Sequence, residues 1–566
     1  MRQNALLFAA AATLGLVTLR VAPVHLHARA QASTQAALTG IVSSDEEGKM
    51  EGVVVTARRD GANFAVSVVS DAQGRYSFPR SHLTAGAYAM TIRAVGYDLT
   101  DRGAVEVKPG TTANADLKLH KTADLSKQIS SIEWAMSVPG TEDQKNMLIK
   151  QAESCTYCHS LERIVKSKHT AEEFVTVIKR MASYYPDGTA APTDGRGRSQ
   201  KHDKPGLEYA EKNPKWGYAP GVEITDLANY LATINLSSGR ALPSELKTLP
   251  RPKGKATRVI VTQYFMPRKD TVPHDMEVDS KGTPWYTDES RMFFGKMDPK
   301  TGVFTEYPLE PVPQGDIPGA RDITMDKEDN PWFPVRFPGS LSLLSKFDVK
   351  TGKLSTVRDA QGQFVSTGPD GKIWVGFIRV DPKTMMVDGR FSFNKSPNLP
   401  PGAHTTYQYQ VNSKGNVYAT DFVGSYIIMI DVNTSEAKFW PTPTRNSLPR
   451  RGRIDSEDRF WFAEYTGDKL AMFDTRSEKF QEWPVQYKYT TPYTESVPDA
   501  NGYVYSPSNT SDRLLRLDPK TGEIIEYQMP TNNFDSKKLA IDPISRRAVW
   551  MANTRDASLI KLEPID

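Results

Sequence analysis

The sequence predicts a multidomain, mainly β protein, with an N-terminal β-sandwich, a small all-α domain and a C-terminal seven-bladed β-propeller. Three observations predict this. Residues 38–119 show the alternation and turns of short strands, residues 141–235 carry apolar side chains at helical spacing, and an aromatic marker recurs regularly after residue 259. Because the chain has 566 residues, it is too long for one hydrophobic core, and several domains are expected.

The first thirty residues read as a cleavable signal peptide. Arg2 is followed by an apolar run from Ala5 to Leu19, and Ala28-Arg29-Ala30 fits a small-x-small cleavage site with Ala30 as the last residue removed. The run has 15 residues, whereas a membrane-spanning helix needs about 20. We therefore expect a periplasmic or secreted protein with no stable membrane span after cleavage.

Charge and cysteine content narrow the function classes. Removing the three arginines of the signal peptide lowers the formal charge from +4 to +1, which gives no reason to expect nucleic-acid binding. The two cysteines lie three positions apart. An exported protein of this size with so few cysteines is not a disulfide scaffold, so this pair is expected to serve a local purpose.

Residues 31–120 are predicted to form the β-sandwich. They resemble the carboxypeptidase regulatory-like, prealbumin-like domains, which implies an accessory module, in some members with a carbohydrate or protein partner. A passive spacer is the alternative. The motifs that carry the resemblance are Gly40-Ile41-Val42, Gly52-Val53-Val54-Val55, Asp71-Ala72-Gln73-Gly74-Arg75-Tyr76-Ser77-Phe78, Gly86-Ala87-Tyr88 and Gly96-Tyr97.

After a connector at residues 121–140, the all-α domain is predicted for residues 141–238. Thr141 can cap a first helix, and Thr170 with Glu173 forms a capping box for a second helix. A third helix is predicted over Ile224–Ile234, before a linker at residues 239–255. The apolar stripe of the second helix consists of Phe174, Val177, Ile178 and Met181.

Cys155-Thr156-Tyr157-Cys158-His159 is a complete C-x-x-C-H motif. Two thiols at this spacing can bond the two vinyl groups of one haem, and the adjacent imidazole can bind its iron. A redox disulfide or a zinc site would leave His159 unexplained, and zinc would need further ligands although no second cysteine pair exists. The motif therefore predicts one covalently attached haem c, held by Cys155, Cys158 and His159.

Residues 142–235 resemble a small cytochrome c. This resemblance implies a second axial ligand on the helix that follows the motif, and Met181 is the candidate metal ligand opposite His159. Met181 could instead be a core residue of its apolar stripe. His202 and His169 are the next candidates, and both are expected at the solvated surface.

Residues 256–566 are predicted to form the seven-bladed propeller. The markers are separated by 47, 42, 44, 43, 44 and 45 residues, a spacing typical of blades. Turns such as Asp279-Ser280-Lys281-Gly282 precede them. Residues 261–267 precede the first unit, and we expect this strand to complete the last blade. The markers are Trp285, Trp332, Trp374, Tyr418, Trp461, Tyr505 and Trp550.

The blades resemble the virginiamycin B lyase (streptogramin lyase) family through Trp-Phe-x-Glu at Trp461–Glu464 and through the Lys-Thr-Gly turns. The resemblance implies a Mg²⁺-assisted elimination with Glu464 and His274 as catalytic residues. The second catalytic imidazole is then either His404 or absent. The unit that contains Glu464 departs from the family, because it begins Pro449-Arg450-Arg451-Gly452 where Pro-His-Gly is expected.

Equivalent blade positions should converge at the propeller mouth, as a site for a divalent cation or polar ligand, or simply as a solvated polar channel. Eleven residues before the markers stand His274, Arg321, Gln363, Tyr407, Arg450, Thr494 and Leu539, with Lys538 replacing Leu539 if that blade has a one-residue insertion. Three residues after the markers stand Asp288, Val335, Phe377, Asp421, Glu464, Ser508 and Asn553.

These features predict a periplasmic electron-transfer protein whose haem exchanges electrons with a redox partner, such as an exported dehydrogenase. The propeller would bind that partner, or a polar small molecule or carbohydrate. Two alternatives stay open: a lyase or haem-coupled oxidoreductase acting at the propeller mouth, and a non-catalytic binding scaffold in which the haem is a structural element.

Overall fold

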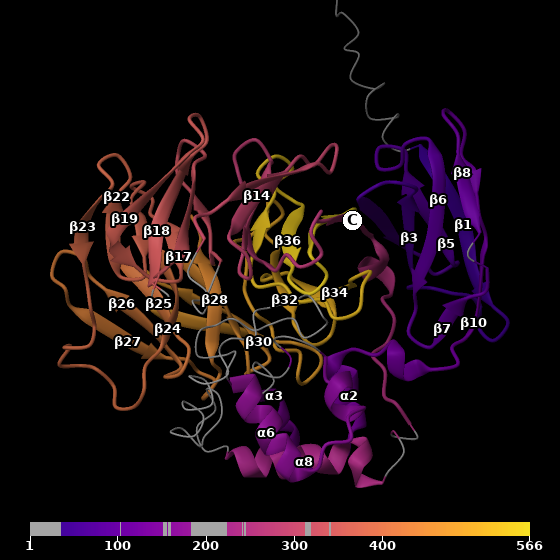
Figure 1. Cartoon of the computed structure of the whole chain (residues 1–566), viewed down its shortest axis with the longest axis horizontal. Coiled ribbons are helices and arrows are strands. Elements are labelled where there is room, and N and C mark those ends of the chain that lie inside the picture. Colours follow the sequence, from indigo (N-terminus) through magenta and orange to yellow (C-terminus); the bar gives the residue numbers. More distant parts are fainter. Residues whose placement is uncertain are drawn as a thin grey trace, which may run out of the picture.

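The computed structural model describes residues 35–101, 103–150, 156, 160–182, 223–239, 242, 245–311, 319–338 and 341–566. The predicted signal peptide, Cys155, Cys158, His159 and His202 lie outside these residues, and Met181 is described only as backbone. The described chain forms a mainly β protein with three units: an N-terminal β-sandwich, a helical unit and a ring of antiparallel sheets (Figure 1).

Two sheets form the sandwich. One contains β1, β2, β5, β7, β9 and β10, and the other contains β3, β4, β6 and β8. Apolar side chains of both sheets, among them Val55, Val66 and Phe78, meet in a common core. The strands are β1 Ala36–Ser44, β2 Gly48–Lys49, β3 Val54–Arg59, β4 Phe64–Val69, β5 Arg75–Pro79, β6 Gly86–Arg93, β7 Tyr97–Leu99, β8 Ala104–Val107, β9 Ala113–Asn114 and β10 Leu117–Lys121.

The second sheet of the sandwich continues into the ring. Strand β11 (Val259–Phe265) pairs antiparallel with β37 (Ser558–Pro564) along its whole length, which confirms that the early strand completes the last blade. Its other edge pairs with β4 from Ile260↔Val68 to Tyr264↔Phe64. Because both edges of β11 are paired, no open edge remains there for another chain to pair with. The sandwich is therefore not a spacer attached only through a flexible segment.

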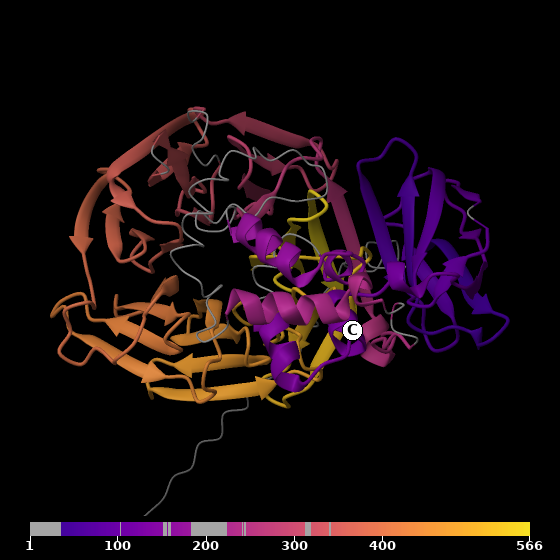
Figure 2. The same ribbon diagram turned by 60° about the horizontal axis from the view of Figure 1, so that its bottom comes forward.

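The remaining sheets follow one another in chain order around the ring (Figure 2), each an antiparallel meander. The strands of the first three sheets are β12 Pro273–Val278, β13 Pro284–Asp288, β14 Phe293–Met297, β15 Phe304–Pro308, β16 Thr324–Met325, β17 Pro331–Phe337, β18 Leu341–Asp348, β19 Lys353–Gln361, β20 Val365–Thr367, β21 Ile373–Val375, β22 Ile378–Asp381 and β23 Met386–Arg390. Those of the others are β24 Thr406–Val411, β25 Val417–Asp421, β26 Tyr426–Ile430, β27 Ala437–Pro441, β28 Pro449–Ile454, β29 Arg459–Glu464, β30 Lys469–Asp474, β31 Lys479–Pro484, β32 Val504–Ser508, β33 Arg513–Leu517, β34 Ile524–Gln528, β35 Leu539–Ile541 and β36 Val549–Asn553.

The repeating turn and the aromatic marker form one structural unit. The indole Nε1 of Trp332 donates to Asp326 Oδ2 at 2.9 Å, and that of Trp461 donates to Asp455 Oδ2 at 2.8 Å. The other oxygen of the same carboxylate accepts a backbone N–H group of the turn, as Asp326 Oδ1 does from Asn330 N. In these units a carboxylate six residues before the aromatic therefore fixes the turn and pairs the buried indole N–H. The indole N–H groups of Trp374 and Trp550 have no such partner among the described residues.

The helical unit contains α2 (Ser131–Ser137), α3 (Glu142–Lys150), α5 (Glu162–Val165), α6 (Ala171–Ala182) and α8 (Ile224–Ile234). The helix predicted over 224–234 has these bounds. The predicted capping box also forms, since Thr170 N donates to Glu173 Oε2 at 2.9 Å and Glu173 N to Thr170 Oγ1 at 3.3 Å. Phe174, Ile178, Leu227 and Leu231 are buried between α6 and α8. Short 3₁₀ turns cover η1 Leu125–Lys127, η2 Leu236–Ser238 and η3 Gly254–Thr257.

Residues 121–140, predicted as a connector, contain α2, and its Trp134 is completely buried in the helical core. The segment 239–255, predicted as a linker, also packs: Leu249 joins this core, and its N–H donates to Glu133 Oε1 at 2.7 Å. One short helix and one isolated leucine give no periodic pattern, which is why the sequence did not reveal either contact.

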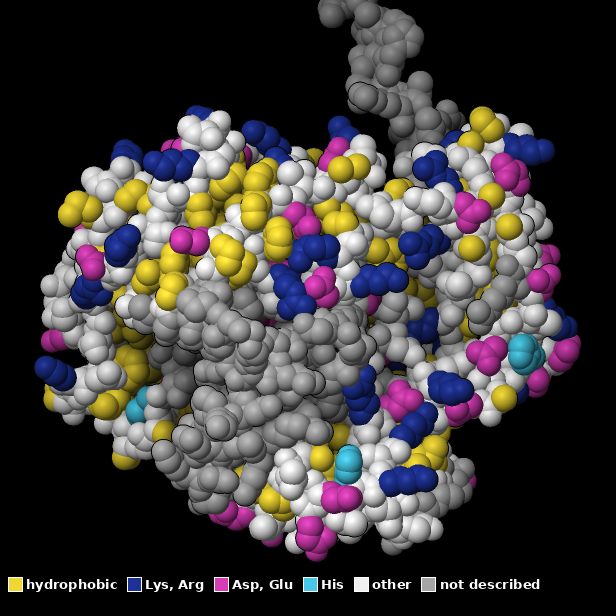
Figure 3. Space-filling model, viewed as in Figure 1, with side chains coloured by type: hydrophobic (Ala, Val, Ile, Leu, Met, Phe, Trp, Pro, Cys, Tyr) yellow, Lys and Arg dark blue, Asp and Glu magenta, His cyan; other side chains and the backbone are white. Residues whose placement is uncertain are grey.

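No helix among the described residues is long and apolar enough to cross a bilayer. On the face seen in Figure 3, basic and acidic side chains are interspersed over the sandwich, the ring and the helical unit.

Candidate functional site

The helical unit contacts the ring at the segment that carries the C-x-x-C-H motif. Thr156, which stands between the two cysteines, is buried, and its carbonyl accepts a hydrogen bond from the Arg555 guanidinium. Arg555 lies in the turn between β36 and β37. Beside it, the Ile132 N–H of α2 donates to the Thr510 carbonyl at 2.9 Å. The motif segment is thus bonded at Thr156 to the face of the ring where the innermost strands begin.

Polar side chains at the starts of the first three innermost strands are connected to one another. His274 Nδ1 lies 2.9 Å from Asp275 Oδ2, and its Nε2 lies 3.9 Å from Glu289 Oε2. Glu289 Oε1 accepts from Arg321 Nε at 2.7 Å, and Arg321 Nη1 donates to Gln363 Oε1 at 2.8 Å. Three of the predicted mouth residues, His274, Arg321 and Gln363, therefore belong to one network.

Arg450 occupies an aromatic cage on the same face. Its guanidinium lies 3.7 Å from the Tyr493 ring centroid and 4.6 Å from that of Tyr465, and the rings of Tyr407 and Phe422 complete the cage. Arg450 Nη2 also donates to the Tyr493 hydroxyl at 2.9 Å. Ring faces around a buried cation stabilise its charge through cation–π interactions.

A second buried cation, Lys537, lies next to this cage. Its Nζ is 4.6 Å from the Tyr493 ring centroid and 2.9 Å from Asp535 Oδ1. Burial lowers the pKa of Lys537 to about 8, with the charges of Arg450 and Arg555 acting in the same direction and Asp535 opposing them. Lys537, Arg450 and Arg555 thus bring three basic side chains close to Asp535 on this part of the ring face.

Further along the axis, Arg451 closes the channel. It forms a two-pronged ion pair with Asp275, with Nη2 2.9 Å from Oδ2, and its Nη1 donates to the Lys537 carbonyl at 2.8 Å. Asp322 lies 3.5 Å from Arg451 and 2.8 Å from Lys538 Nζ. These contacts link four different sheets, so Arg451 acts as a central clamp of the ring.

The three residues proposed for lyase chemistry come from three different sheets of the ring. His274 belongs to β12, His404 precedes β24, and Glu464 ends β29.

His404 is held as a hydrogen-bond donor on both ring nitrogens. Nδ1 lies 2.6 Å from Asp421 Oδ2, and Nε2 donates to the Pro400 carbonyl at 2.8 Å. Although burial opposes it, the Asp421 hydrogen bond raises the pKa of His404. An imidazole that donates from both nitrogens has no lone pair with which to accept a proton.

Glu464 is completely buried and lies near a second buried carboxyl. Burial, and secondarily the nearby Glu482 carboxylate, raise the pKa of Glu464 to about 8. Burial also raises the pKa of Glu495 well above its ordinary value, and its Oε1 accepts the Ala471 N–H at 3.0 Å. Burial thus favours the protonated form of both Glu464 and Glu495.

Two of the carboxylates proposed as magnesium ligands, Asp288 and Asp421, accept backbone N–H groups. Asp288 Oδ1 accepts the N–H groups of Val272 at 3.2 Å and Ser290 at 2.9 Å. Asp421 Oδ1 accepts those of Thr405 at 2.9 Å and Gly424 at 3.1 Å. These carboxylates fix turns, and among the described residues no group of three or more His, Cys, Asp or Glu side chains could hold a metal ion.

Sequence reasoning missed several residues of this face. Lys538 lines the channel while Leu539 is buried in the apolar core, so the one-residue insertion considered for that blade is present. The roles of Arg451, Lys537 and Arg555 were not predicted. Only the doubled Arg450-Arg451 in an innermost strand was a usable signal, because the other contacts join sheets far apart in the sequence.

The carboxypeptidase regulatory-like domain model matches residues 37–120, which confirms the predicted sandwich over that range. No curated protein matches the chain in sequence. Among solved structures, a catalytically inactive virginiamycin B lyase from Staphylococcus aureus with quinupristin is 19% identical, covers 54% of this chain and 99% of its own, and has a TM-score of 0.46. A streptogramin B lyase structure is 16% identical over 55% of this chain and 99% of its own, with a TM-score of 0.47. The extracellular domain of a hybrid two-component system from B. thetaiotaomicron is 15% identical over 51% of this chain and 40% of its own, with a TM-score of 0.40.

Proposed function

We propose that this chain is an exported c-type haem protein that transfers electrons, and that its ring binds a redox partner or substrate beside the haem. The C-x-x-C-H motif at residues 155–159 carries this proposal. The hydrogen bond from Arg555 to Thr156 supports the second part, because it ties the motif to the basic, aromatic face of the ring. An exported dehydrogenase is the class of partner that such a protein would serve.

The helical unit suits a haem. Cys155 and Cys158 would form the thioether bonds, and His159 and Met181 would be the axial ligands, with His202 and His169 as alternatives to Met181. The indole Nε1 of Trp134 is buried and has no acceptor among the described residues. A haem brings two propionate carboxylates, which are acceptors of the kind that this buried donor lacks.

The residues of the chain would supply binding, orientation and exclusion of water. A bound haem iron takes up and releases one electron. The apolar side chains of α6 and α8 keep water from the core in which it would lie. Arg555 holds the backbone of the motif.

We also propose that the helical unit is a cytochrome c domain and that the ring has seven blades. Six sheets, beginning with β12, β16, β20, β24, β28 and β32, together with the sheet of β35, β36, β37 and β11, support the blade count. In the sixth unit, the bridge Pro492↔Ser508 stands where the other sheets have a regular innermost strand.

Covalent haem is the decisive test. We expect the protein from an export-competent host to retain porphyrin absorbance after denaturation and to change its visible spectrum with dithionite. Changing Cys155 and Cys158 together to Ser should abolish the retained absorbance, while Lys168→Ala, at an exposed position, should leave it unchanged. A denatured wild-type polypeptide without porphyrin would refute the proposal.

A further inference from the structure

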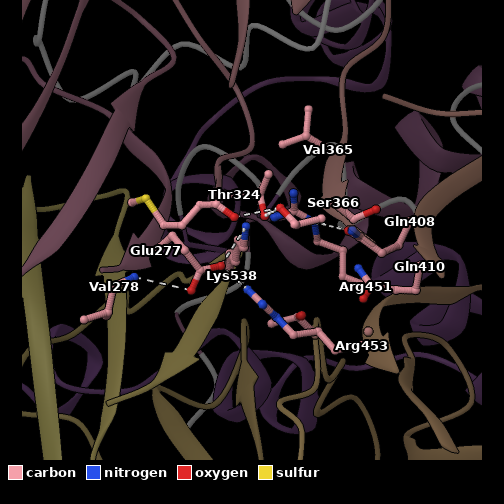
Figure 4. Close-up of a pocket in the computed structure, with 14 residues that line it drawn as sticks. Glu277, Val278, Thr324, Val365, Ser366, Gln408, Gln410, Arg451, Arg453 and Lys538 are labelled. Atoms are coloured by element: carbon pink, nitrogen blue, oxygen red, sulfur yellow. Dashed lines mark hydrogen bonds and ion pairs between the residues drawn. The ribbon is translucent and has the colours of Figure 1, made fainter. Parts of the chain in front are cut away.

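A polar cavity occupies the part of the central channel beyond the Arg451 clamp (Figure 4). It has a volume of about 250 Å³ and is lined mainly by side chains of the innermost strands. Exposure increases along it, since the side chain of Arg451 is 2% exposed and that of Arg453 is 29% exposed. The cavity therefore opens away from the ring face that contacts Thr156.

The charged groups of the cavity neutralise one another. Arg453 Nη2 lies 2.6 Å from Glu277 Oε2, and Lys538 Nζ lies 2.8 Å from Asp322 Oδ1. Arg451 is paired with Asp275. Each of the three cations in the wall is thus paired with a carboxylate, Glu277 in the wall itself and Asp322 and Asp275 buried behind it. Charges paired in this way offer little net attraction to an anionic or a cationic ligand.

Several neutral polar groups that line the cavity have no hydrogen-bond partner among the described residues. Gln408 and Gln410 line it through β24, and their side-chain oxygens accept from Arg451 Nε at 3.3 Å and Ile454 N at 3.5 Å. Their amide Nε2 groups donate to none of the described residues. The hydroxyl of Ser366, which is 5% exposed, also lacks a partner among the described residues, and Thr494 lines the cavity beside it.

We propose that this cavity binds a neutral, polyhydroxylated small molecule of monosaccharide or polyol size. Amide and hydroxyl groups from three sheets can donate to and accept from several ligand hydroxyls at once. An apolar ligand would leave these groups unpaired in a buried site, which is unfavourable. The site is separate from the haem proposal, because it lies on the other side of the Arg451 clamp from Thr156.

Titration calorimetry on the full-length, oxidised protein tests the site, with glucose and mannitol as neutral probes and gluconate and glucosamine as charged probes. We expect saturable binding of at least one neutral probe below roughly 10 mM, and at least tenfold weaker binding of both charged probes. Gln410→Leu should weaken the binding about fivefold or more, whereas Gln481→Leu, on the exposed outer strand of a neighbouring sheet, should not change it.

Gln410→Glu gives a second, nearly isosteric test. This variant should bind the neutral probe more weakly than the wild type does. Its thermal transition should shift by no more than that of Gln410→Leu. The proposal is overturned if neither glucose nor mannitol binds saturably, or if gluconate binds as tightly as the neutral probe. Wild-type affinity for the neutral probe in both Gln410 variants would also overturn it. Retained porphyrin absorbance in the same preparations reports on the haem separately, so each proposal can fail without the other.

Discussion

Buried carboxyls give single side chains a measurable influence on stability. The pKa of Glu464 is raised to about 8 by burial, from an ordinary value of 4.5. Between these two values the folded protein keeps the proton, whereas the unfolded chain loses it. Rising pH therefore favours unfolding over this window, by up to about 1.4 kcal/mol for each pH unit.

We therefore expect the free energy of unfolding of the wild type to fall relative to that of Glu464→Gln as pH rises from about 5 to about 8, and the difference to become constant above that range. Denaturant titrations at several pH values measure it. Glu457→Gln, at an exposed position in the same sheet, should show no such divergence. Parallel curves for wild type and Glu464→Gln would show that Glu464 is ionised in the fold.

Among the strands, β11 is distinctive because it is hydrogen-bonded on both sides across a unit boundary. Its amides should exchange with deuterium only when the last blade and the sandwich open together. Hydrogen-exchange mass spectrometry should then show β4 and β11 protected alike and much longer than β8, which pairs only with β6. Rapid exchange of β4 with a protected β11 would mean that the sheet is not continuous in solution.

Periodic elements could be predicted from the sequence, and contacts between distant elements could not. The aspartate–indole hydrogen bond recurs at Trp285, Trp332 and Trp461, and in each case its aspartate stands six residues before the marker in the sequence. The helix over Ile224–Ile234 follows from its apolar period. Nothing in β4 indicates that it pairs with β11, since both are ordinary strands whose partners are set by tertiary packing.

The candidate site shows the same division. The covalent haem motif is local, and five consecutive residues suffice to predict it. The network of Arg451 with Asp275 and Asp322 joins side chains more than a hundred residues apart in the sequence. The repeat spacing predicts that these residues belong to one ring, but it does not predict which side chains form ion pairs. Glu464 matched a family motif, yet its buried position depends on packing that a motif does not encode.

The three units together should unfold as one cooperative body. The sheet through β11 joins the sandwich to the ring, and the helical unit is joined to the ring through Arg555 and Thr156, Ile132 and Thr510, and the ion pair of Lys488 with Glu142 at 2.8 Å. Units connected by buried hydrogen bonds and shared apolar cores lose these contacts together. A single calorimetric transition is therefore expected for the wild type.

Arg555→Ala should split the single calorimetric transition into two. The substitution leaves the buried Thr156 carbonyl without its donor and removes the guanidinium 3.7 Å from Asp535, which should cost about 1–3 kcal/mol of contact between the helical unit and the ring. We expect a second transition at lower temperature, with porphyrin still attached. Arg546→Ala, in an exposed turn of the same sheet, should melt like the wild type. If Arg555→Ala also melts in one unshifted step, the helical unit is held to the ring by its apolar contacts with Tyr487 and Tyr489 rather than by this hydrogen bond.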